Sequence, residues 1–297
     1  MAEVSPFFIS VVIVNYNGAP FLERCLTSLA AQTYAAYEII LVDNASTDDS
    51  CAWVEKNFPR VHLVRSATNI GFAAGNNLGF QHARGEWIAT LNTDTCVERD
   101  YLEKLSAPMA AAQDAAAVGA CAPLMLEMEH PDIVDAAGIR VDRFGFAWNV
   151  GAGEKANQFT TPREVYGACA GAALYRRAML DQIGFFDAAY FGFYEDADLA
   201  WRARKAGWKT MFVPQARVYH LHGASFGKIS PRKTYLLARN RWWTTLKNFP
   251  RASLALHLPL ILILDLASLF QAARRGHFQE AWRGRVDAWR GWREIRN

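Results

Sequence analysis

The first half of the chain alternates short apolar runs with stretches of helical spacing. Four of the runs are rich in β-branched and aromatic residues and are predicted to be strands: FFISVVIVN, YEIILVD, VHLVR and EWIATLN. The first stretch between them carries one apolar stripe, formed by Leu22, Leu26 and Leu29, and others begin near Ala73 and Asp100. This alternation predicts βαβ units and an α/β fold, with a mostly parallel central sheet flanked by helices.

Polar residues follow three of these runs directly. The three clusters are Asn15-Tyr16-Asn17-Gly18, Asp43-Asn44-Ala45-Ser46 and Asn92-Thr93-Asp94. In sheets of this kind, ligands bind beyond the carboxyl ends of the strands. We therefore expect the chemistry of the protein to lie along that edge of the sheet.

The second half of the chain has a different organisation. Residues 116–175 are Gly-rich and lean toward β structure, and Gly145, Gly151 and Gly153 indicate a mobile loop or an edge hairpin. From Pro231 onward the pattern is helical. We predict an α/β domain over residues 1–230 and a helical C-terminal extension over residues 231–297.

Composition narrows the class of protein. Of 297 residues, 52% are hydrophobic and 21% are charged, as in a globular protein, and the net charge of +3 argues against a partner dominated by phosphate contacts such as nucleic acid. The five cysteines are odd in number and widely spaced, which supports neither a disulfide framework nor a zinc site. The apolar N-terminal run lacks a basic flank and a cleavage pattern, so it reads as a buried strand in a cytoplasmic protein.

Two segments near the predicted strand ends could bind a nucleotide. Asp43 can accept a hydrogen bond from the N3–H of uracil or thymine, or it can belong to the cluster that caps the next helix. The segment TNIGFAAGNNLGF is a Gly-rich turn into a helix whose free N–H groups attract phosphate. Within it, Gly71 permits close packing, and Asn69 and Asn76 can hydrogen-bond a ligand.

Two further segments carry candidate metal ligands. In LNTDT, Asn92 and Asp94 can point into one crevice, where a carboxylate and diphosphate oxygens would suit Mg²⁺ or Mn²⁺, although the same pair also favours a turn. In VYHLHGAS, His220 and His222 share one face of a predicted strand. Each pattern has a purely structural interpretation when it is taken alone.

Three carboxylates stand at the start of a predicted basic helix in GFFDAAYFGFYEDADLAWRARKAGW. A solvated first turn explains Asp198, because acidic side chains there complement the helix dipole. Glu195 and Asp196 are flanked by aromatic and aliphatic residues, which predicts an apolar wall around them. Carboxylates beside such a wall are candidates for acid–base or metal chemistry.

Taken in order, these motifs resemble glycosyltransferase family 2, and most closely its bacterial rhamnosyltransferase-like members. The resemblance covers roughly residues 8–250. It implies the GT-A fold, inverting sugar transfer from a nucleotide-sugar donor such as dTDP-rhamnose or a UDP-sugar, and Mg²⁺ or Mn²⁺ as cofactor. It also implies a glycan or polyprenyl-linked acceptor in cell-surface polysaccharide synthesis.

The resemblance also implies roles for individual residues. Asp196 matches the catalytic base, with Glu195 beside it, and Asp94 matches the last acid of the family's DxD motif and hence a metal ligand. Asn92 replaces the first acid of that motif, which leaves less charge for the metal. His220 matches a further metal ligand, and His222 is the competing choice. The donor-binding positions are Asn15, Tyr16 and Asp43 at the base and Asn69, Gly71, Asn76 and Asn92 near the ribose and diphosphate.

Two other functions fit parts of the pattern. A nucleotidyltransferase would carry a Gly-rich basic loop after the first strand, where this chain has NYNGAPFLERC. A non-catalytic nucleotide-sugar-binding protein would not need Asp94, Asp196 and His220 together. Both remain as alternatives.

The C-terminal region predicts contact with a membrane surface. Residues 252–270 are apolar and long enough to span a bilayer but include His257, Pro259 and Asp265, which favours a helix lying on a membrane or packed on the protein. Residues 274–297 carry seven arginines and place three tryptophans on one helical face. We expect a cytoplasmic enzyme, peripheral on the inner face of the cell membrane; the alternative is ordinary packing of both segments on the catalytic domain.

Overall fold

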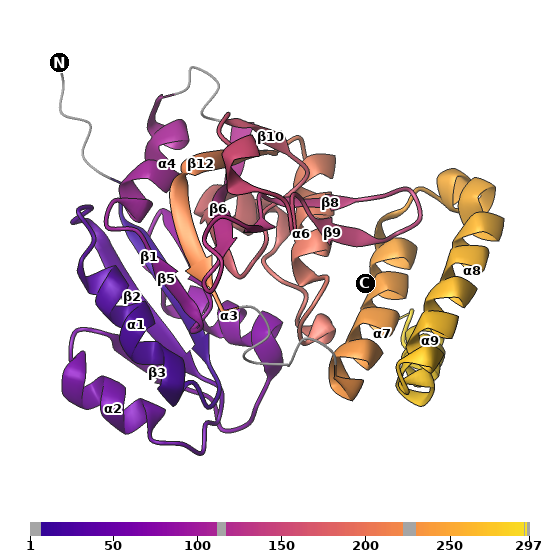
Figure 1. Cartoon of the computed structure of the whole chain (residues 1–297), viewed down its shortest axis with the longest axis horizontal. Coiled ribbons are helices and arrows are strands. Elements are labelled where there is room, and N and C mark those ends of the chain that lie inside the picture. The colour runs from indigo at the N-terminus through magenta and orange to yellow at the C-terminus, as the bar shows by residue number, and fades with distance from the viewer. Residues whose placement is uncertain (1–6, 112–116, 222–229, 294, 296–297) are drawn as a thin grey trace.

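The computed structural model describes residues 7–111, 117–221, 230–293 and 295. Its main sheet has the strand order β10-β12-β6-β11-β4-β1-β2-β3, with β5 pairing β12 and β7 pairing β6 (Figure 1). The strands of this sheet are β1 (Ile9–Asn15), β2 (Tyr37–Asp43), β3 (His62–Arg65), β4 (Trp87–Leu91), β5 (Thr95–Val97), β6 (Val118–Glu127), β7 (Val134–Ala136), β10 (Arg163–Val165), β11 (Ala172–Arg176) and β12 (Lys209–His220).

The sheet is mixed. Strands β3, β2, β1 and β4 are mutually parallel, whereas β11 runs antiparallel to both β4 and β6. The four strands predicted from the apolar runs are β1 to β4, so the α/β class is confirmed. Parallel pairing also places the ends of β1, β2 and β4, and the polar clusters that follow them, at one edge.

Helices cover both faces of the sheet. On one face lie α1 (Ala19–Ala30), α2 (Ser50–Asn57) and α4 (Tyr101–Ala111), and the predicted stripe Leu22, Leu26 and Leu29 is fully buried there. On the other face lie α3 (Gly71–His82), α5 (Arg177–Ile183) and α6 (Glu195–Lys205). Alternate residues of β1 pack into the two cores, because successive side chains of a strand point to opposite faces of the sheet. Val11 and Ile13 face α1, and Val12 faces α3.

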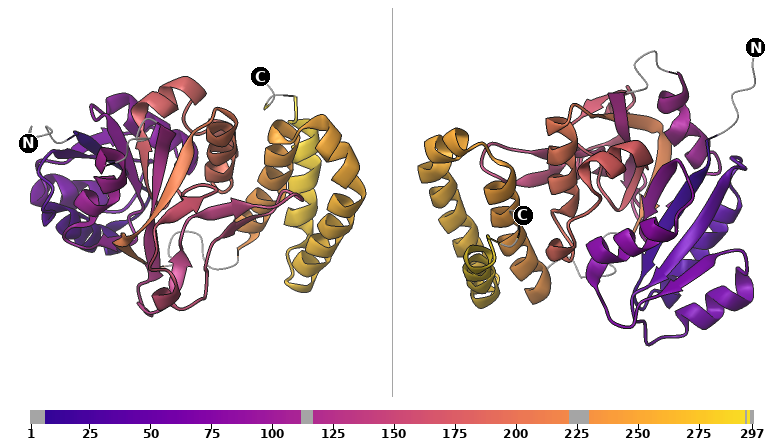
Figure 2. Two further views of the ribbon diagram at one scale, coloured as in Figure 1. Left: turned by 90° about the horizontal axis from the view of Figure 1, so that it is seen from above. Right: turned by 180° about the vertical axis from the view of Figure 1, so that it is seen from behind.

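Three long helices form the C-terminal part: α7 (Pro231–Asn248), α8 (Arg251–Arg274) and α9 (Phe278–Arg290). They lie together at one end of the molecule, and of these three helices α7 lies nearest the sheet (Figure 2). A third apolar core joins them to the α/β part of the chain, with Tyr190 and Tyr194 packing beside Trp242 and Trp243 of α7. The domain boundary near residue 230 stays a prediction.

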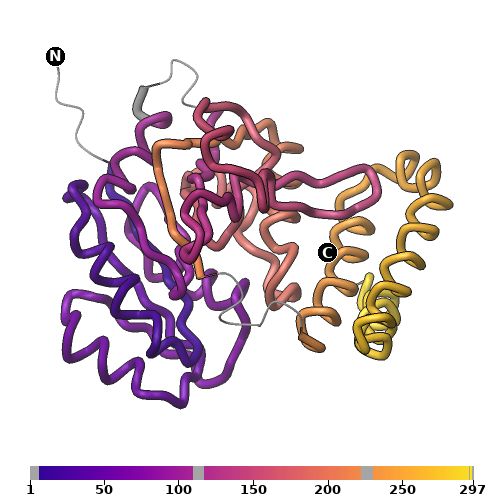
Figure 3. Tube along the Cα trace, in the orientation of Figure 1, coloured from indigo at the N-terminus to yellow at the C-terminus, as the bar shows by residue number. Residues whose placement is uncertain are grey.

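The glycine-rich segment forms the predicted hairpin. Strands β8 (Ile139–Val141) and β9 (Ala147–Asn149) pair antiparallel in a small sheet of their own. The hairpin extends away from the main sheet toward the C-terminal helices (Figure 3). At its tip the Phe144 ring meets His257 of α8, and Gly145 adopts φ +81° against Thr245 of α7, where any side chain would clash.

Candidate active site

A cavity of about 610 Å³ lies beyond the ends of β1 and β4. Seven of the residues predicted to form the site line it: Tyr16, Asn69, Gly71, Asn92, Glu195, Asp196 and His220. Four others, Asn15, Asp43, Asn76 and Asp94, are buried behind the lining. Segments that are more than 200 positions apart in the chain thus line the same cavity.

Asn15 and Asp43 form one buried polar cluster. Asn15 Nδ2 donates to Asp43 Oδ1 at 3.2 Å and to the hydroxyl of Ser50 at 2.9 Å, and Asp43 also accepts from the backbone N–H of Ser46. The loop that follows β2 is therefore held by the end of β1. Tyr16, the next residue along, is 51% exposed at the cavity and is free to contact a planar base.

The turn before α3 is built by a residue that the sequence analysis did not single out. Asn44 accepts from the N–H of Ile70 at 2.8 Å and donates to Asn69 Oδ1 and to the Gly71 carbonyl, each at 3.1 Å. Gly71 has φ +84°, and a Cβ there would lie 2.5 Å from the Phe191 carbonyl oxygen. Nothing in the sequence distinguishes Asn44 from the other polar residues that follow a strand.

The start of α3 differs from the expectation of a phosphate site with free N–H groups. The Phe72 and Ala73 N–H groups both donate to the carbonyl oxygen of Phe191, at 2.6 and 3.2 Å. Asn76 also does not reach the cavity: it is 1% exposed, and its Nδ2 donates to the Phe72 carbonyl at 2.9 Å. This helix start is tied to the loop before α6 instead.

The candidate metal ligands lie side by side. His220 Nε2 is 3.3 Å from Asp94 Oδ1, and the other ring nitrogen, Nδ1, is 2.7 Å from Asp135 Oδ2. A histidine that binds metal through one nitrogen commonly donates the other N–H to a carboxylate, which fixes the ring and its tautomer. Asp135, on the short strand β7, supplies that carboxylate and had no recognisable sequence signal. His222 lies outside the described residues.

This donor set fits a hard divalent cation that takes most of its ligands from elsewhere. Among the described residues, no group of three or more His, Cys, Asp or Glu side chains is placed to hold a metal. One carboxylate and one oriented imidazole still suit Mg²⁺ or Mn²⁺ in a site completed by phosphate oxygens and water. Burial disfavours the charged ring, but hydrogen bonds to Asp135 and Asp94 outweigh it and raise the pKa of His220 to about 9.

Glu195 and Asp196 open α6 and face the cavity together. Asp196 accepts from the backbone N–H of Ala197 at 2.8 Å and of Ala170 at 3.4 Å, whereas Glu195 Oε2 is buried with no hydrogen-bond partner in the described part of the chain. Burial raises the pKa of both carboxyls, and the adjacent Asp196 charge raises that of Glu195 further, to well above its usual range. Glu195 therefore holds a proton more readily, and Asp196 is the better carboxylate.

Asp198 is not the solvated residue that the sequence predicted. It is fully buried and pairs with Arg202 Nε at 2.8 Å and with Lys247 Nζ of α7 at 3.1 Å. Asn248 Nδ2 donates to it as well, at 2.9 Å. Asp198 therefore joins α6 to α7, because a buried carboxylate is tolerated only where such partners surround it.

The loop before Glu195 is strained. Phe191, Phe193 and Tyr194 all have positive φ, a conformation that non-glycine residues rarely adopt. Asn240 of α7 is fully buried, and its Nδ2 lies within 2.8–3.0 Å of the carbonyl oxygens of Tyr190, Gly192 and Phe193. The helix α7 thereby holds the backbone that aims the two carboxylates.

We expect Asn240→Ala to lower kcat by about 100-fold, the loss that a misplacement of about 1 Å can cause. The reason is that the three carbonyl groups lose their shared donor and the strained loop relaxes. The matched control is Thr244→Val, one turn further along α7, which removes the 3.0 Å contact between the Thr244 and Tyr190 hydroxyls without touching the loop backbone. If the two variants, both folded at the assay temperature, lose kcat equally, Asn240 has only a general structural role.

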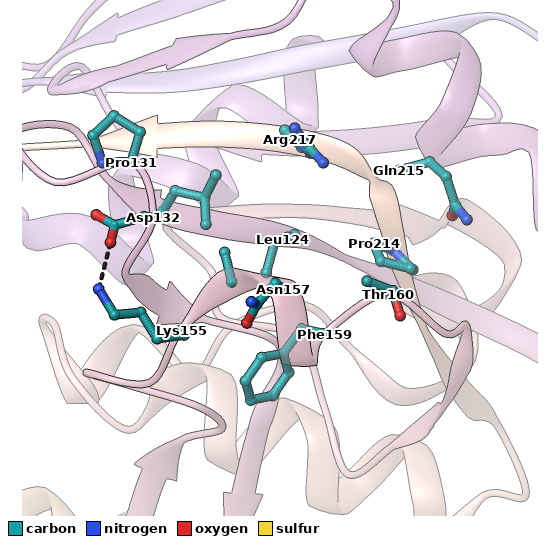
Figure 4. A pocket seen from close by; sticks show the side chains of 12 residues that line it. Leu124, Pro131, Asp132, Lys155, Asn157, Phe159, Thr160, Pro214, Gln215 and Arg217 are labelled. Atoms are coloured by element: carbon teal, nitrogen blue, oxygen red, sulfur yellow. Dashed lines mark hydrogen bonds and ion pairs between the residues drawn. The ribbon is translucent and has the colours of Figure 1, made fainter.

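A second cavity, of about 670 Å³, lies elsewhere on the molecule, between β6, β12 and the segment around residue 157 (Figure 4). Leu124 and Phe159 line it, and an exposed ion pair joins Asp132 and Lys155 at its margin. None of the predicted site residues lines this cavity. The predicted site residues therefore favour the first cavity.

The chain has a mixed α/β sheet, with an acid–imidazole pair and a candidate carboxylate base beyond its strand ends, and solved structures confirm that its fold is GT-A. GalNAc-T7 with UDP, GalNAc and Mn²⁺ has a TM-score of 0.65 at 19% identity, covering 82% of this chain and 48% of that one. The mannosyltransferase PcManGT from Pyrobaculum calidifontis, in complex with GDP-Man and Mn²⁺, has a TM-score of 0.61 at 19% identity, covering 99% of this chain and 84% of that one.

The sequence itself matches the model of the family "Glycosyl transferase family 2" over residues 10–184. The chain belongs to glycosyltransferase family 2. It is 29% identical, over 93% of its length and 97% of the relative's, to the N-acetylglucosaminyl-diphospho-decaprenol L-rhamnosyltransferase of Mycobacterium tuberculosis. The predicted family and enzyme class are confirmed, and neither the nucleotidyltransferase nor the non-catalytic alternative finds support.

Proposed function

We propose that this enzyme transfers a sugar, with inversion, from a nucleotide-sugar donor to a hydroxyl of a polyprenyl-linked glycan at the cytoplasmic face of the cell membrane. The observation that carries the proposal is the shared cavity: Asp196 lines it together with His220, which is paired with Asp94. A base for the acceptor and a cation site for the leaving diphosphate are two elements by which a protein can promote inverting transfer.

In the proposed reaction, the acceptor hydroxyl attacks the anomeric carbon of the donor while Asp196 takes its proton. The new C–O bond forms as the bond to the diphosphate oxygen breaks, and the nucleoside diphosphate leaves with the electron pair. Burial favours Asp196 as base, because it raises the pKa of this carboxyl and so increases its affinity for the proton. Glu195 holds a proton more readily than Asp196, because burial and the Asp196 charge both raise its pKa.

Asp94 and His220 are the residues that would hold Mg²⁺ or Mn²⁺. When bound, the cation would neutralise the negative charge that develops on the leaving diphosphate. Asp135 keeps the His220 ring oriented for this purpose through its 2.7 Å contact with Nδ1. Mn²⁺ in both structural neighbours supports this assignment.

We assign the donor to the side of the cavity formed by the ends of β1 and β2. Tyr16 offers an exposed ring to the base, with Asn15 and Asp43 supporting the loop beneath it. Asn69, Gly71 and Asn92 line the path toward the diphosphate, whereas Asn76 serves α3. The mycobacterial relative is named for rhamnose transfer to a decaprenyl diphosphate-linked N-acetylglucosamine, which supports dTDP-rhamnose, or a UDP-sugar, as donor and a lipid-linked glycan as acceptor.

Thermal-shift screening of nucleotides and nucleotide sugars tests the donor site. A donor at about 100 times its Kd adds about 2.7 kcal/mol to the free energy of unfolding, which corresponds to a rise in Tm of several degrees. We expect this rise with dTDP- or UDP-sugars in the presence of Mn²⁺ and a smaller one with EDTA. GDP-sugars serve as the control, and a shift confined to them would contradict the proposed base specificity.

A further inference from the structure

The outer face of α8 is almost wholly apolar. Five large side chains follow helical spacing along it, and each is between 42% and 77% exposed: Leu256, Leu260, Ile263, Leu266 and Phe270. Among the described helices, α8 alone is long and apolar enough to cross a membrane by composition. Exposed apolar surface of this extent and continuity marks an interaction site rather than ordinary protein surface.

The inner face of the same helix carries one buried charge, Asp265, between the buried apolar residues Ile261 and Leu269. Asp265 accepts hydrogen bonds from Arg241 and Trp242 of α7, and from Arg285 Nε of α9 at 2.7 Å. The Arg285 guanidinium also donates to the hydroxyl of Ser268 at 2.6 Å. The charge that argued against a spanning helix thus points inward, and it cross-links α8 to both neighbouring helices.

Exposed arginines and aromatic rings lie at the ends of α8 and on the neighbouring helix α9. Six arginines of this region are exposed, at the ends of α8 and along or just beyond α9: Arg251, Arg274, Arg275, Arg283, Arg290 and Arg293. Among the described residues of the same region, the acidic groups partly open to solvent are Glu280 and Asp287. Trp282 and Trp289 are each more than half exposed on α9, and Phe278 stacks on Trp282.

We propose that α8 and α9 bind the surface of an anionic bilayer, with α8 lying in the plane of the interface and its outer face sunk among the acyl chains. Charge selects this partner: the exposed arginines complement anionic headgroups, and tryptophan favours the interfacial layer. This contact identifies the part of the enzyme that meets the membrane in the proposed function. It depends on that proposed function only for the lipid-linked acceptor. A spanning arrangement would place Arg241 and Arg285 in hydrocarbon or break the Asp265 network, and either is costly.

Flotation of the full-length protein with phosphatidylglycerol vesicles tests the proposal. We expect the wild type to float at low salt and to remain mostly unbound with neutral phosphatidylcholine vesicles. The double variant Ile263→Glu/Leu266→Glu changes only exposed positions, so it should fold normally and lose at least tenfold in bound fraction, because charges on this face oppose insertion. The control, Ala30→Glu/Ala52→Glu, adds the same charge at exposed positions of α1 and α2 and should float like the wild type.

Two results would overturn the interfacial contact. One is a wild type that stays soluble with anionic vesicles and sediments as a dimer that the Ile263→Glu/Leu266→Glu variant dissociates, which would assign the face to a second copy of the chain. The other is retention of the bound protein in alkaline carbonate, which would show a spanning helix. A transfer assay with a water-soluble acceptor separates the membrane contact from the proposed sugar transfer. The Ile263→Glu/Leu266→Glu variant should keep its transfer activity in this assay, because the acceptor does not depend on a membrane.

Discussion

Replacing Asp196 with asparagine is expected to lower kcat by about two to four orders of magnitude while the protein stays folded and still binds its donor. That range is the usual contribution of a general base. Asparagine preserves the shape of the side chain, and its amide oxygen can keep accepting from the Ala197 N–H, which lies at 2.8 Å. The measurement is steady-state transfer with a saturating donor, together with the donor-dependent rise in Tm.

The neighbouring carboxyl provides the control. Because burial and the Asp196 charge raise the pKa of Glu195 well above its usual range, Glu195 holds a proton more readily than Asp196, and Glu195→Gln should closely resemble the protonated carboxyl. We expect less than about a tenfold loss of kcat in that variant. The opposite ranking of the two variants would move the role of base to Glu195.

The pH profile gives an independent check on the same assignment. Asp196 acts as a base only when it is ionised, so the rate should fall as the pH drops through its pKa, which burial raises above the ordinary aspartate value. In Asp196→Asn the remaining activity should lack this acidic limb. An unchanged limb would show that another group controls it.

Asp94→Ala is expected to abolish the metal-dependent part of donor binding, a loss greater than the 10- to 100-fold typical of outer-shell partners of a metal. The reason is that Asp94 is the only carboxylate of the LNTDT motif, and the partner left in the pair is the His220 imidazole. Titration calorimetry with the donor, in Mn²⁺ and in EDTA, measures the effect. Equal donor affinity of the wild type under both conditions would refute the metal assignment.

Asn92→Asp is the matched variant with the opposite expectation. It restores the first acid of the family's motif on a residue that lines the cavity. The added charge should increase Mn²⁺ affinity in the absence of nucleotide. Weaker Mn²⁺ binding in this variant would indicate that Asn92 does not face the cation.

The sequence was most informative where local patterns determine structure. Apolar runs and leucine spacing predicted β1 to β4 and α1, because burial on one or two faces imposes a period on each element. The polar residues after β1 and β4 were correctly expected at one edge, since parallel strands end together. The glycines of the segment indicated either a mobile loop or an edge hairpin, and the structure has the hairpin of β8 and β9.

The residues that were missed act across long sequence distances. Asn44 builds the turn at Gly71, Asp135 orients His220 from 85 positions away, and Asn240 holds a loop about 50 positions earlier in the chain. Polar side chains of this kind carry no periodicity, so single-sequence reasoning cannot distinguish them from surface residues. Asp198 was misassigned for the same reason: its partner Lys247 lies on a helix that the sequence does not link to α6.

The Asp265 network has a consequence for biosynthesis. While the chain is being made, α8 leaves the ribosome before α9 exists, so Asp265 still lacks Arg285 as a partner. An aspartate at the centre of an apolar helix opposes lateral entry into the membrane by about 2.5–3.5 kcal/mol. The same carboxylate that joins the three C-terminal helices therefore also disfavours insertion of α8 across a bilayer before α9 has been made.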